Sequence, residues 1–196
     1  MIVGLTGGIG SGKSTVAKIF KKNTNVAVYI ADDEAKELMN SSKIIKEKLI
    51  AHFGEKSYLN GQLNRKYISD IVFDNKEKLK ELNSIVHPEV KKHFQDFLKL
   101  NKDKLYVLYE NAILFETENN KFCDFIISVN VDIETRIQRI IKRDSCSRND
   151  VLNRINNQWK EDKKLLQSHY LIYNNKMENI NIQVVRIHNI LTKSRA

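Results

Sequence analysis

Five of the seven glycines in this 196-residue chain lie within its first twelve residues. The segment from Gly7 to Ser14, GGIGSGKS, follows a short apolar run at residues 2–6 and precedes a segment with the apolar spacing of a helix. It fits the pattern G-x-x-x-x-G-K-[ST] without mismatch. Such a turn needs backbone angles that glycine adopts at low cost, so the pattern predicts a strand, a glycine-rich loop and a helix in that order.

The same segment predicts a binding site for a nucleoside triphosphate. Successive N–H groups of the loop and the positive end of the helix dipole would surround phosphate oxygens. Lys13 would reach the β- and γ-phosphates, and the Ser14 hydroxyl would bind Mg²⁺. An accidental match in a glycine-rich turn is the alternative, and Lys13 and Ser14 in this context disfavour it. The residues expected to bind ATP here are Gly8, Gly10, Ser11, Gly12, Lys13, Ser14 and Thr15.

The apolar pattern of the rest of the chain predicts an α/β fold with a mostly parallel sheet. Short apolar runs, typical of buried strands, occur at residues 2–6, 26–30, 105–109, 125–129 and 170–173. Helical spacing lies between them, with Asp132 as an expected N-cap. Residues 33–100 are almost wholly helical in pattern around an Asn60-Gly61 turn. We therefore expect a nucleotide-binding core (1–32, 101–135 and 169–196), a helical insertion (33–100) and a basic helical lid (136–168).

Charge and composition narrow the class of protein. The net charge of +9 favours anionic partners, and residues 136–164 contribute nine Lys or Arg against four Asp or Glu. The D-x-x-G motif of a regulatory GTPase is absent, so a small-molecule kinase is favoured. No apolar run is long enough for a membrane span, and no secretory signal is visible. Cys123 and Cys146 have no metal-ligand spacing, and reduced thiols predict a cytoplasmic protein.

At this point the sequence resembles the dephospho-CoA kinase family. The matching segments are residues 5–17 (LTGGIGSGKSTVA), Asp32 through Lys36, Leu63-Asn64-Arg65, His87-Pro88, Leu114-Phe115-Glu116, Arg139 with Arg143-Asp144, Gln158, and Asn174-Asn175. The resemblance implies transfer of the γ-phosphoryl group of ATP, with Mg²⁺, to the ribose 3′-hydroxyl of dephospho-CoA, the last step of coenzyme A synthesis. It also implies a three-layer P-loop kinase core with a five-stranded parallel sheet, a helical substrate-binding insertion and a helical lid. Ile30 and Ala112 replace an Asp and a Pro that are usual in the family.

The resemblance assigns catalytic roles to Lys13, Asp32 and Arg139. It makes Asp32 the group that orients the 3′-hydroxyl or accepts its proton; the alternatives are an N-cap role for Asp32, or Asp33 as the base. Arg136, Arg139 and Arg143 share one helical face, where Arg139 is the candidate for stabilising the transition state. We expect Arg136 to lie on a solvated basic face, with the apolar stripe Ile133, Ile137, Ile140 and Ile141 toward the core.

Further residues are assigned to ATP, substrate and metal. Arg143, Arg148 and Asn175 are expected to bind ATP, and Arg148 and Arg154 to close over it with the lid. Asn174-Asn175 is expected to contact the adenine of ATP, with a simple turn as the alternative. Arg65, His87 and Glu116 are expected to bind the substrate, although His87-Pro88 is equally compatible with a helix junction. Glu110 is expected to reach Mg²⁺ through water, or else to be a solvated strand end. Lys91 and Lys92 fit a solvated helix face, and Trp159 fits the core.

Two other functions compete with this prediction. A nucleoside monophosphate kinase shares the core and lid but needs no base such as Asp32, because its acceptor is a phosphate. A nucleic-acid-binding P-loop ATPase would explain the charge of +9, but the basic strands with interleaved aromatics that favour nucleic acid are missing. We therefore expect ATP and dephospho-CoA as partners, no nucleic acid or membrane partner, and a monomer or weak homo-oligomer.

Overall fold

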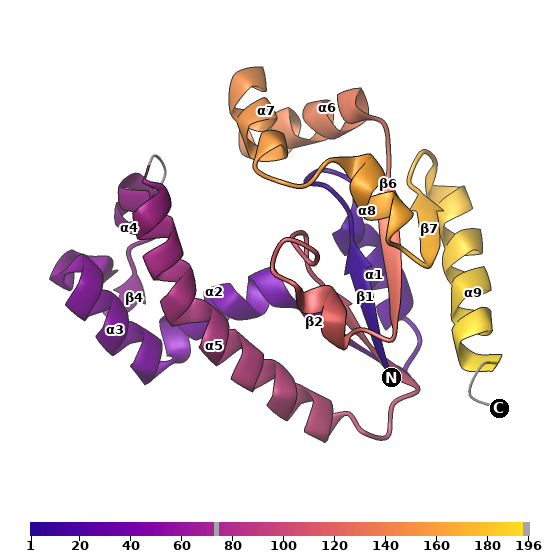
Figure 1. Cartoon of the computed structure of the whole chain (residues 1–196), viewed down its shortest axis with the longest axis horizontal. Helices are drawn as coiled ribbons and strands as arrows, with labels where there is room; N and C mark the ends of the chain where they lie inside the picture. Colours follow the sequence, from indigo (N-terminus) through magenta and orange to yellow (C-terminus); the bar gives the residue numbers. More distant parts are fainter. Residues whose placement is uncertain (73–74, 194–196) are drawn as a thin grey trace. The chain divides into compact units, whose positions relative to one another are not determined.

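The computed structural model describes residues 1–72 and 75–193, except for the side chain of Met177. The described chain forms two compact units. The core unit contains residues 1–29 and 103–196, and the helical unit contains residues 30–102. Figure 1 follows the chain through both, and each is described here by itself.

A five-stranded parallel sheet is the centre of the core unit, as predicted. Its strands are β1 (Ile2–Thr6), β2 (Val26–Ile30), β5 (Tyr106–Glu110), β6 (Phe125–Asn130) and β7 (Tyr170–Tyr173). They are arranged in the order β2-β5-β1-β6-β7, so β1, which leads into the glycine-rich loop, is the central strand. It pairs in parallel with β5 and β6, with Leu5 opposite both Glu110 and Ile127. The strands are short and mostly apolar, as is typical of parallel strands in a sheet with helices on both faces.

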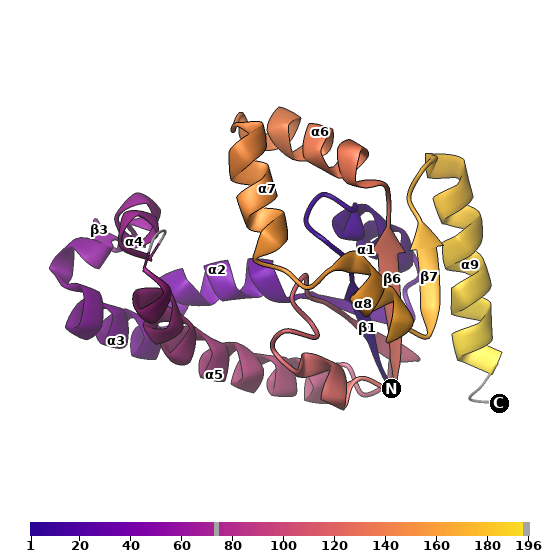
Figure 2. The same cartoon turned by 45° about the horizontal axis from the view of Figure 1, so that its top comes forward.

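Helices α1 (Lys13–Lys21) and α9 (Met177–Lys193) pack against each other and against the sheet. Their apolar stripes complete the main core, where Val16 and Ile180 are fully buried and Phe20 is nearly so. Helix α8 (Glu161–Leu166) contacts β6 on the opposite side of the strands from α1 (Figures 1 and 2). The result is a sheet between two helical layers.

Two further helices of the core unit carry the basic segment. They are α6 (Ile133–Asp144) and α7 (Arg148–Asn156). The Asp132 side chain caps α6 by accepting from the Thr135 N–H at 2.8 Å, which confirms the predicted N-cap. Ile137, Ile140 and Val151 form a small core of their own beneath Ile9 of the loop. The predicted stripe is wrong at Ile133, which is 54% exposed because it begins the helix beyond this core.

The helical unit begins with α2 (Ala31–Ser41) and α3 (Lys43–Phe53) and continues through a short 3₁₀ turn (Glu55–Ser57). Strands β3 (Tyr58–Leu59) and β4 (Gln62–Leu63) then form a minimal antiparallel hairpin. Its turn residues, Asn60 and Gly61, both have positive φ, as tight hairpin turns require. The hairpin departs from the almost wholly helical pattern predicted for this segment. Helices α4 (Arg65–Val72) and α5 (Lys76–Leu100) follow.

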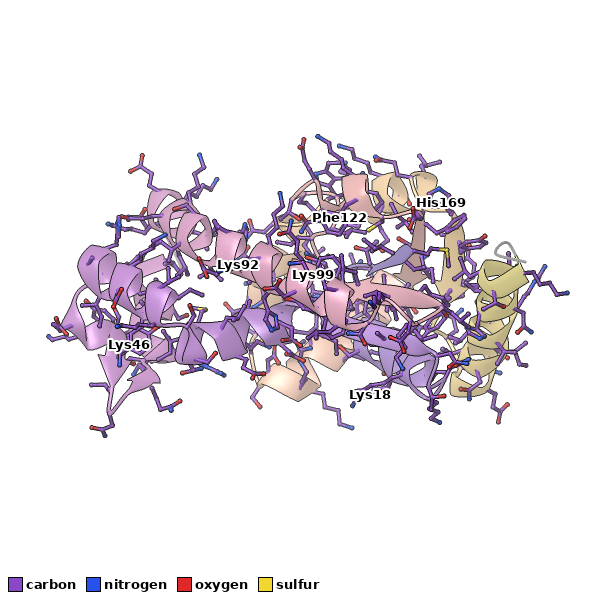
Figure 3. All side chains as sticks on the ribbon, turned by 90° about the horizontal axis from the view of Figure 1, so that it is seen from below. Lys18, Lys46, Lys92, Lys99, Phe122 and His169 are labelled. Carbon is purple, nitrogen blue, oxygen red and sulfur yellow. The ribbon has the colours of Figure 1, made fainter. Side chains whose placement is uncertain are left out.

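Pro88 lies inside α5, so the helix junction considered at His87-Pro88 is wrong. Proline inside a helix costs about 3 kcal/mol, because it removes one hydrogen bond and crowds the preceding turn. Buried residues on both sides of it, Val86 and Val90, belong to one continuous apolar face of the 25-residue helix. Their packing outweighs the local cost. Lys92 and Lys99 of α5 lie on its exposed surface (Figure 3).

Every helix in the described part of the chain is either too short or too polar to cross a bilayer.

Candidate active site

The loop between β1 and α1 has the conformation that its glycines predict. Gly7, Gly10 and Gly12 have φ values of 142°, 81° and 91°, and Gly12 is the N-cap of α1. A Cβ atom on Gly7 would overlap the Val129 carbonyl oxygen, and one on Gly12 would overlap Nδ2 of Asn174. Glycine is therefore required at these two positions by both backbone angle and space.

Lys13, the first residue of α1, folds back over this loop. Its ammonium group is buried and donates to the carbonyl oxygens of Gly7 at 3.1 Å and Gly8 at 3.4 Å. The Ser11 hydroxyl is buried in the loop and has no hydrogen-bond partner among the residues that the structure describes. Ser14 lies exposed in the first turn of α1. A lysine ammonium beside the N-terminus of a helix, at a glycine-rich loop, is a site for an anion.

The prediction that Arg136 lies on a solvated basic face is wrong. Its side chain is buried against this loop, and the residue is only 5% exposed. Its Nε donates to the Ile9 carbonyl at 2.9 Å, and its Nη1 donates to Glu161 at 2.8 Å. The helical spacing had placed it on a solvated face. The spacing could not show that a loop 127 residues earlier in the chain covers that face.

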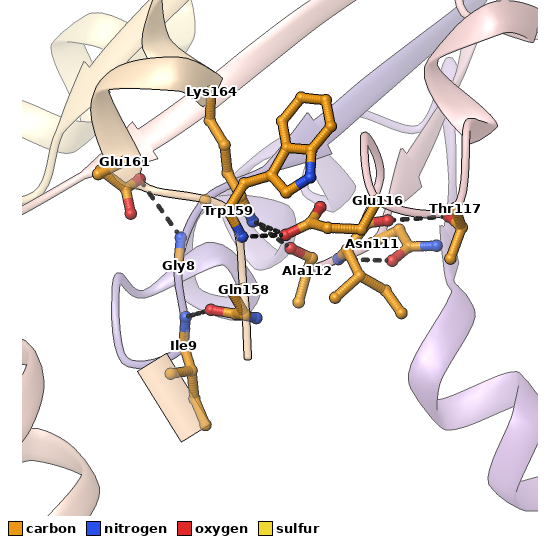
Figure 4. A network of polar contacts seen from close by, with 12 residues as sticks. Gly8, Ile9, Asn111, Ala112, Glu116, Thr117, Gln158, Trp159, Glu161 and Lys164 are labelled. Atoms are coloured by element: carbon orange, nitrogen blue, oxygen red, sulfur yellow. Dashed lines mark hydrogen bonds and ion pairs between the residues drawn. The ribbon is translucent and has the colours of Figure 1, made fainter. Parts of the chain in front are cut away.

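Two further side chains, which were not predicted as site residues, bind the backbone of the loop. The Ile9 N–H donates to Oε1 of Gln158 at 2.8 Å, and the Gly8 N–H donates to Oε1 of Glu161 at 3.4 Å (Figure 4). Gln158 was quoted only as part of the family resemblance. Glu161 carried no signal in the sequence, since an acidic residue in a basic segment is ordinarily solvated.

Asn174, the residue after β7, is the asparagine that contacts the loop. Its side chain is buried, and its Nδ2 donates to the Ser11 carbonyl at 2.7 Å. Its own carbonyl accepts from Arg139 at 3.2 Å, so Arg139 lies beside the loop. Asn175, predicted to bind ATP, is exposed and lines a surface pocket of about 340 Å³ with Tyr173 and Asn179.

Arg143, Arg148 and Arg154 are exposed and form ion pairs with carboxylates of helix α6. Arg148 donates twice to Glu134, at 2.7 and 2.8 Å, which lowers the pKa of that carboxyl. Arg143 and Arg154 both pair with Asp144, at 2.7 and 2.6 Å. Exposed pairs of this kind contribute about 0–1 kcal/mol, so they are easily exchanged for another anion.

Glu116 lies in a buried ion pair with Lys164. Its Oε1 accepts from Lys164 at 2.9 Å and from the Trp159 N–H at 2.8 Å, while Lys164 also donates to the Ala112 carbonyl. Its Oε2 is buried without a hydrogen-bond partner in the described part of the chain. Trp159 stacks on Phe115 with the rings nearly parallel but is only half-buried, so the prediction that it belongs to the core is confirmed in part. Glu110 ends β5 and is buried, so it is not a solvated strand end.

The remaining predicted residues belong to the helical unit. Asp32 and Asp33 are exposed in the first turn of α2, whose N-cap is Ile30, so Asp32 is not an N-cap. Asp33 pairs with Lys36 at 2.9 Å. Arg65 begins α4, and His87 lies on α5, where desolvation lowers the pKa of its imidazole. Lys91 and Lys92 are exposed, as expected for a solvated helix face.

The central parallel strand is followed by a glycine-rich loop and then by a helix that begins with Lys-Ser. This arrangement defines a P-loop kinase fold and its phosphate-binding site. A family model described as "Dephospho-CoA kinase" matches residues 1–179. A Fusobacterium nucleatum dephospho-CoA kinase is 39% identical over 176 residues, which cover 89% of this chain and 90% of that protein. The chain therefore belongs to the dephospho-CoA kinase family.

Solved structures share this architecture over nearly the whole chain. The Thermus thermophilus protein TT1252 superimposes with a TM-score of 0.83 at 27% identity, over 97% of this chain and 96% of that one. A dephospho-CoA kinase from Campylobacter jejuni gives a TM-score of 0.73 at 24% identity, over 100% and 98%. The second likeness concerns the fold alone.

Proposed function

We propose that this chain transfers the γ-phosphoryl group of ATP to the ribose 3′-hydroxyl of dephospho-CoA, which yields coenzyme A and ADP. Membership of the dephospho-CoA kinase family supports the choice of dephospho-CoA as the acceptor. The single structural observation that carries the proposal is the loop at residues 7–12, with the buried Lys13 ammonium folded over it. This is the arrangement that a polyphosphate requires.

The loop and Lys13 bind and orient the triphosphate. When a nucleotide enters, the Lys13 ammonium exchanges the carbonyl oxygens of Gly7 and Gly8 for phosphate oxygens. Charge-assisted bonds to phosphate are stronger than bonds to neutral carbonyls, which favours this exchange. The Ser11 hydroxyl, which has no hydrogen-bond partner within the described part of the chain, supplies a further donor in the same loop. Phosphoryl transfer depends mainly on such positioning and charge stabilisation.

Arg139 is the proposed arginine for the charge that develops on the transferred group. A Cβ on Gly12 would lie 3.6 Å from its Nη1, so the guanidinium is beside the N-cap of α1. An arginine in this role contributes roughly 10³–10⁵ in rate. Arg143 and Arg148 are proposed to bind ATP by leaving their exposed carboxylate partners, within a lid formed by residues 136–168.

Mg²⁺ fits the donor set of the core unit. The Ser14 hydroxyl and the Glu110 carboxylate are oxygen ligands of the kind that Mg²⁺ prefers, with Glu110 acting through water. Within residues 1–72 and 75–193, no group of three or more His, Cys, Asp or Glu side chains could hold a metal. Most ligands would therefore be phosphate oxygens and water, as is usual for Mg²⁺. Bound Mg²⁺ would neutralise charge on the β- and γ-phosphates.

For the acceptor, we assign Asp32 as the group that orients the 3′-hydroxyl and accepts its proton late in the transfer. Its exposed carboxylate at the start of α2 is available for this role. A sugar hydroxyl barely ionises near neutral pH, so orientation is the larger contribution. Arg65, His87 and Glu116 are proposed substrate ligands. The cytoplasmic location and the oligomeric state stay predictions.

Two variants test the assignment of roles. Lys13→Ala should remove most phosphoryl transfer and weaken ATP binding. Asp32→Asn should lower kcat while the ATP dissociation constant, measured by calorimetry, stays near that of the wild type. Full turnover by Asp32→Asn would move the base elsewhere, with Asp33→Asn as the next variant. Full turnover by Lys13→Ala would contradict the proposed function of the loop.

A further inference from the structure

The loop is held from outside by three side chains, here called the clamp: Arg136, Gln158 and Glu161. Arg136 bonds the Ile9 carbonyl, Gln158 accepts from the Ile9 N–H, and Glu161 accepts from the Gly8 N–H. Arg136 and Glu161 also pair with each other at 2.8 Å. The clamp thus fixes both polar groups of the Ile9 backbone and the N–H of Gly8.

The Arg136–Glu161 pair is buried, whereas the ion pairs of Arg143, Arg148 and Arg154 are exposed. Its side chains are only 6% and 17% exposed, against 50% and 54% for Arg148 and Glu134. Water reaches such a place poorly, so losing one charge leaves the other only partly solvated. Each partner therefore depends more on the other than in a surface pair.

The clamp is itself anchored to another part of the core unit. Trp159 lies between Gln158 and Glu161 in the sequence. Its backbone N–H donates to Glu116, and its ring stacks on that of Phe115 with the centroids 5.8 Å apart. Three residues after Glu161, the fully buried Lys164 bonds Glu116 and the Ala112 carbonyl. Figure 4 shows that the segment reaches the loop on one side and residues 111–117 on the other.

We propose that Arg136 and Glu161 are positioning residues for ATP, which hold the loop in its phosphate-binding conformation before the nucleotide arrives. The proposal rests on the proposed function of the loop but not on the identity of the acceptor. When only a fraction of the molecules has the loop in the binding-competent conformation, the apparent affinity for the ligand falls in proportion to that fraction. Bound ATP then orders the loop itself, so the transfer step is little affected. The expected signature is a higher KM for ATP at a nearly constant kcat.

Two variants address the clamp. Arg136→Gln and Glu161→Gln each remove one charge, and Glu161→Gln keeps an acceptor for the Gly8 N–H. The control is Lys121→Gln, which removes the same charge as Arg136→Gln from an exposed pair with Glu118.

The measurements are the dissociation constant of ATP by calorimetry without acceptor, the steady-state constants and the melting temperature. We expect each single variant to raise the dissociation constant and KM of ATP about tenfold, with kcat within about threefold. The double variant Arg136→Gln/Glu161→Gln should add little to the worse single one, because the two residues act as a unit. Lys121→Gln should match the wild type.

Several results would overturn the proposal. A lower melting temperature with unchanged ATP affinity would make the clamp merely structural. A large fall in kcat at unchanged affinity would place Arg136 on the reacting phosphoryl group. Wild-type protein that binds no ATP would overturn both this proposal and the proposed function. If ATP binds but dephospho-CoA is not phosphorylated, the proposed acceptor fails, while the calorimetric result still decides the role of the clamp.

Discussion

Replacing Lys164 by Met is a severe test of the buried network behind the loop. Lys164 is fully buried, and its ammonium bonds Oε1 of Glu116 at 2.9 Å and the Ala112 carbonyl at 2.8 Å. Methionine keeps nearly the same volume and flexibility, so a cavity contributes little to the effect. The charge is lost, however, and the Glu116 carboxylate keeps only the Trp159 N–H as a donor in the described network.

The structure indicates the size of the loss. Removing one partner of a buried ion pair costs about 3–5 kcal/mol. Glu116 is 15% exposed, so some hydration is recovered and the lower end, about 3 kcal/mol, applies. A domain of ordinary stability has about 5–15 kcal/mol in total, so the loss is large but survivable.

Urea unfolding followed by tryptophan fluorescence measures this loss at the right place. Trp159 is the only tryptophan of the chain, and it lies between Phe115, on which it stacks, and the Lys163 ammonium. The double variant Lys164→Met/Glu116→Gln should regain part of the stability, because no carboxylate is then left unpaired. Lys121→Met, at an exposed pair, is the control. A loss below about 1 kcal/mol for Lys164→Met, or an additive double variant, would refute the reasoning.

Two further predictions concern the loop and the pH dependence of stability. Gly12→Ala should weaken ATP binding more than about tenfold by calorimetry, because it adds about 1–2 kcal/mol of left-handed strain and overlaps Asn174. Gly61→Ala, with φ +80° and no heavy atom of the described residues within 4 Å of its Cβ, carries similar strain and should leave ATP binding unchanged. Desolvation lowers the pKa of His188 below 6.5, and its ring nitrogens bond Asn23 and Tyr106, so the folded state resists protonation. The unfolded state therefore takes up this proton at a higher pH than the folded state, and the unfolding free energy should fall as pH drops through 6.5. The fall should be smaller in His188→Gln, and an equal dependence of the unfolding free energy on pH in the two proteins would contradict this.

Much of the core unit could be predicted because buried parallel strands are continuous apolar runs. Strands β1, β2 and β7 have the predicted bounds, and the Asp132 cap follows from local chemistry alone. The position of Pro88 inside α5 could not be predicted in this way. Local propensity favours a helix break at a proline, whereas the packing of residues on both sides of Pro88 maintains one continuous helix.

The candidate site could be predicted only where its chemistry is local. The loop from Gly7 to Ser14 is contiguous, so its pattern is visible in the sequence. The clamp joins Ile9 to Arg136 and Gln158, more than 120 residues away, and periodicity cannot show which helix face such a contact covers. Asn174 was part of the family resemblance, but its contact with the loop could not be predicted for the same reason, because its partner is the distant Ser11 carbonyl.

The central claim is that a phosphoryl group held by the loop passes to the ribose hydroxyl of dephospho-CoA. The most direct measurement is ADP release from ATP–Mg²⁺ by the purified protein, compared among dephospho-CoA, AMP, CMP and dTMP as acceptors. We predict that kcat/KM for dephospho-CoA exceeds that for each nucleoside monophosphate by roughly 100-fold or more. A nucleoside monophosphate that proves the better acceptor would contradict the account.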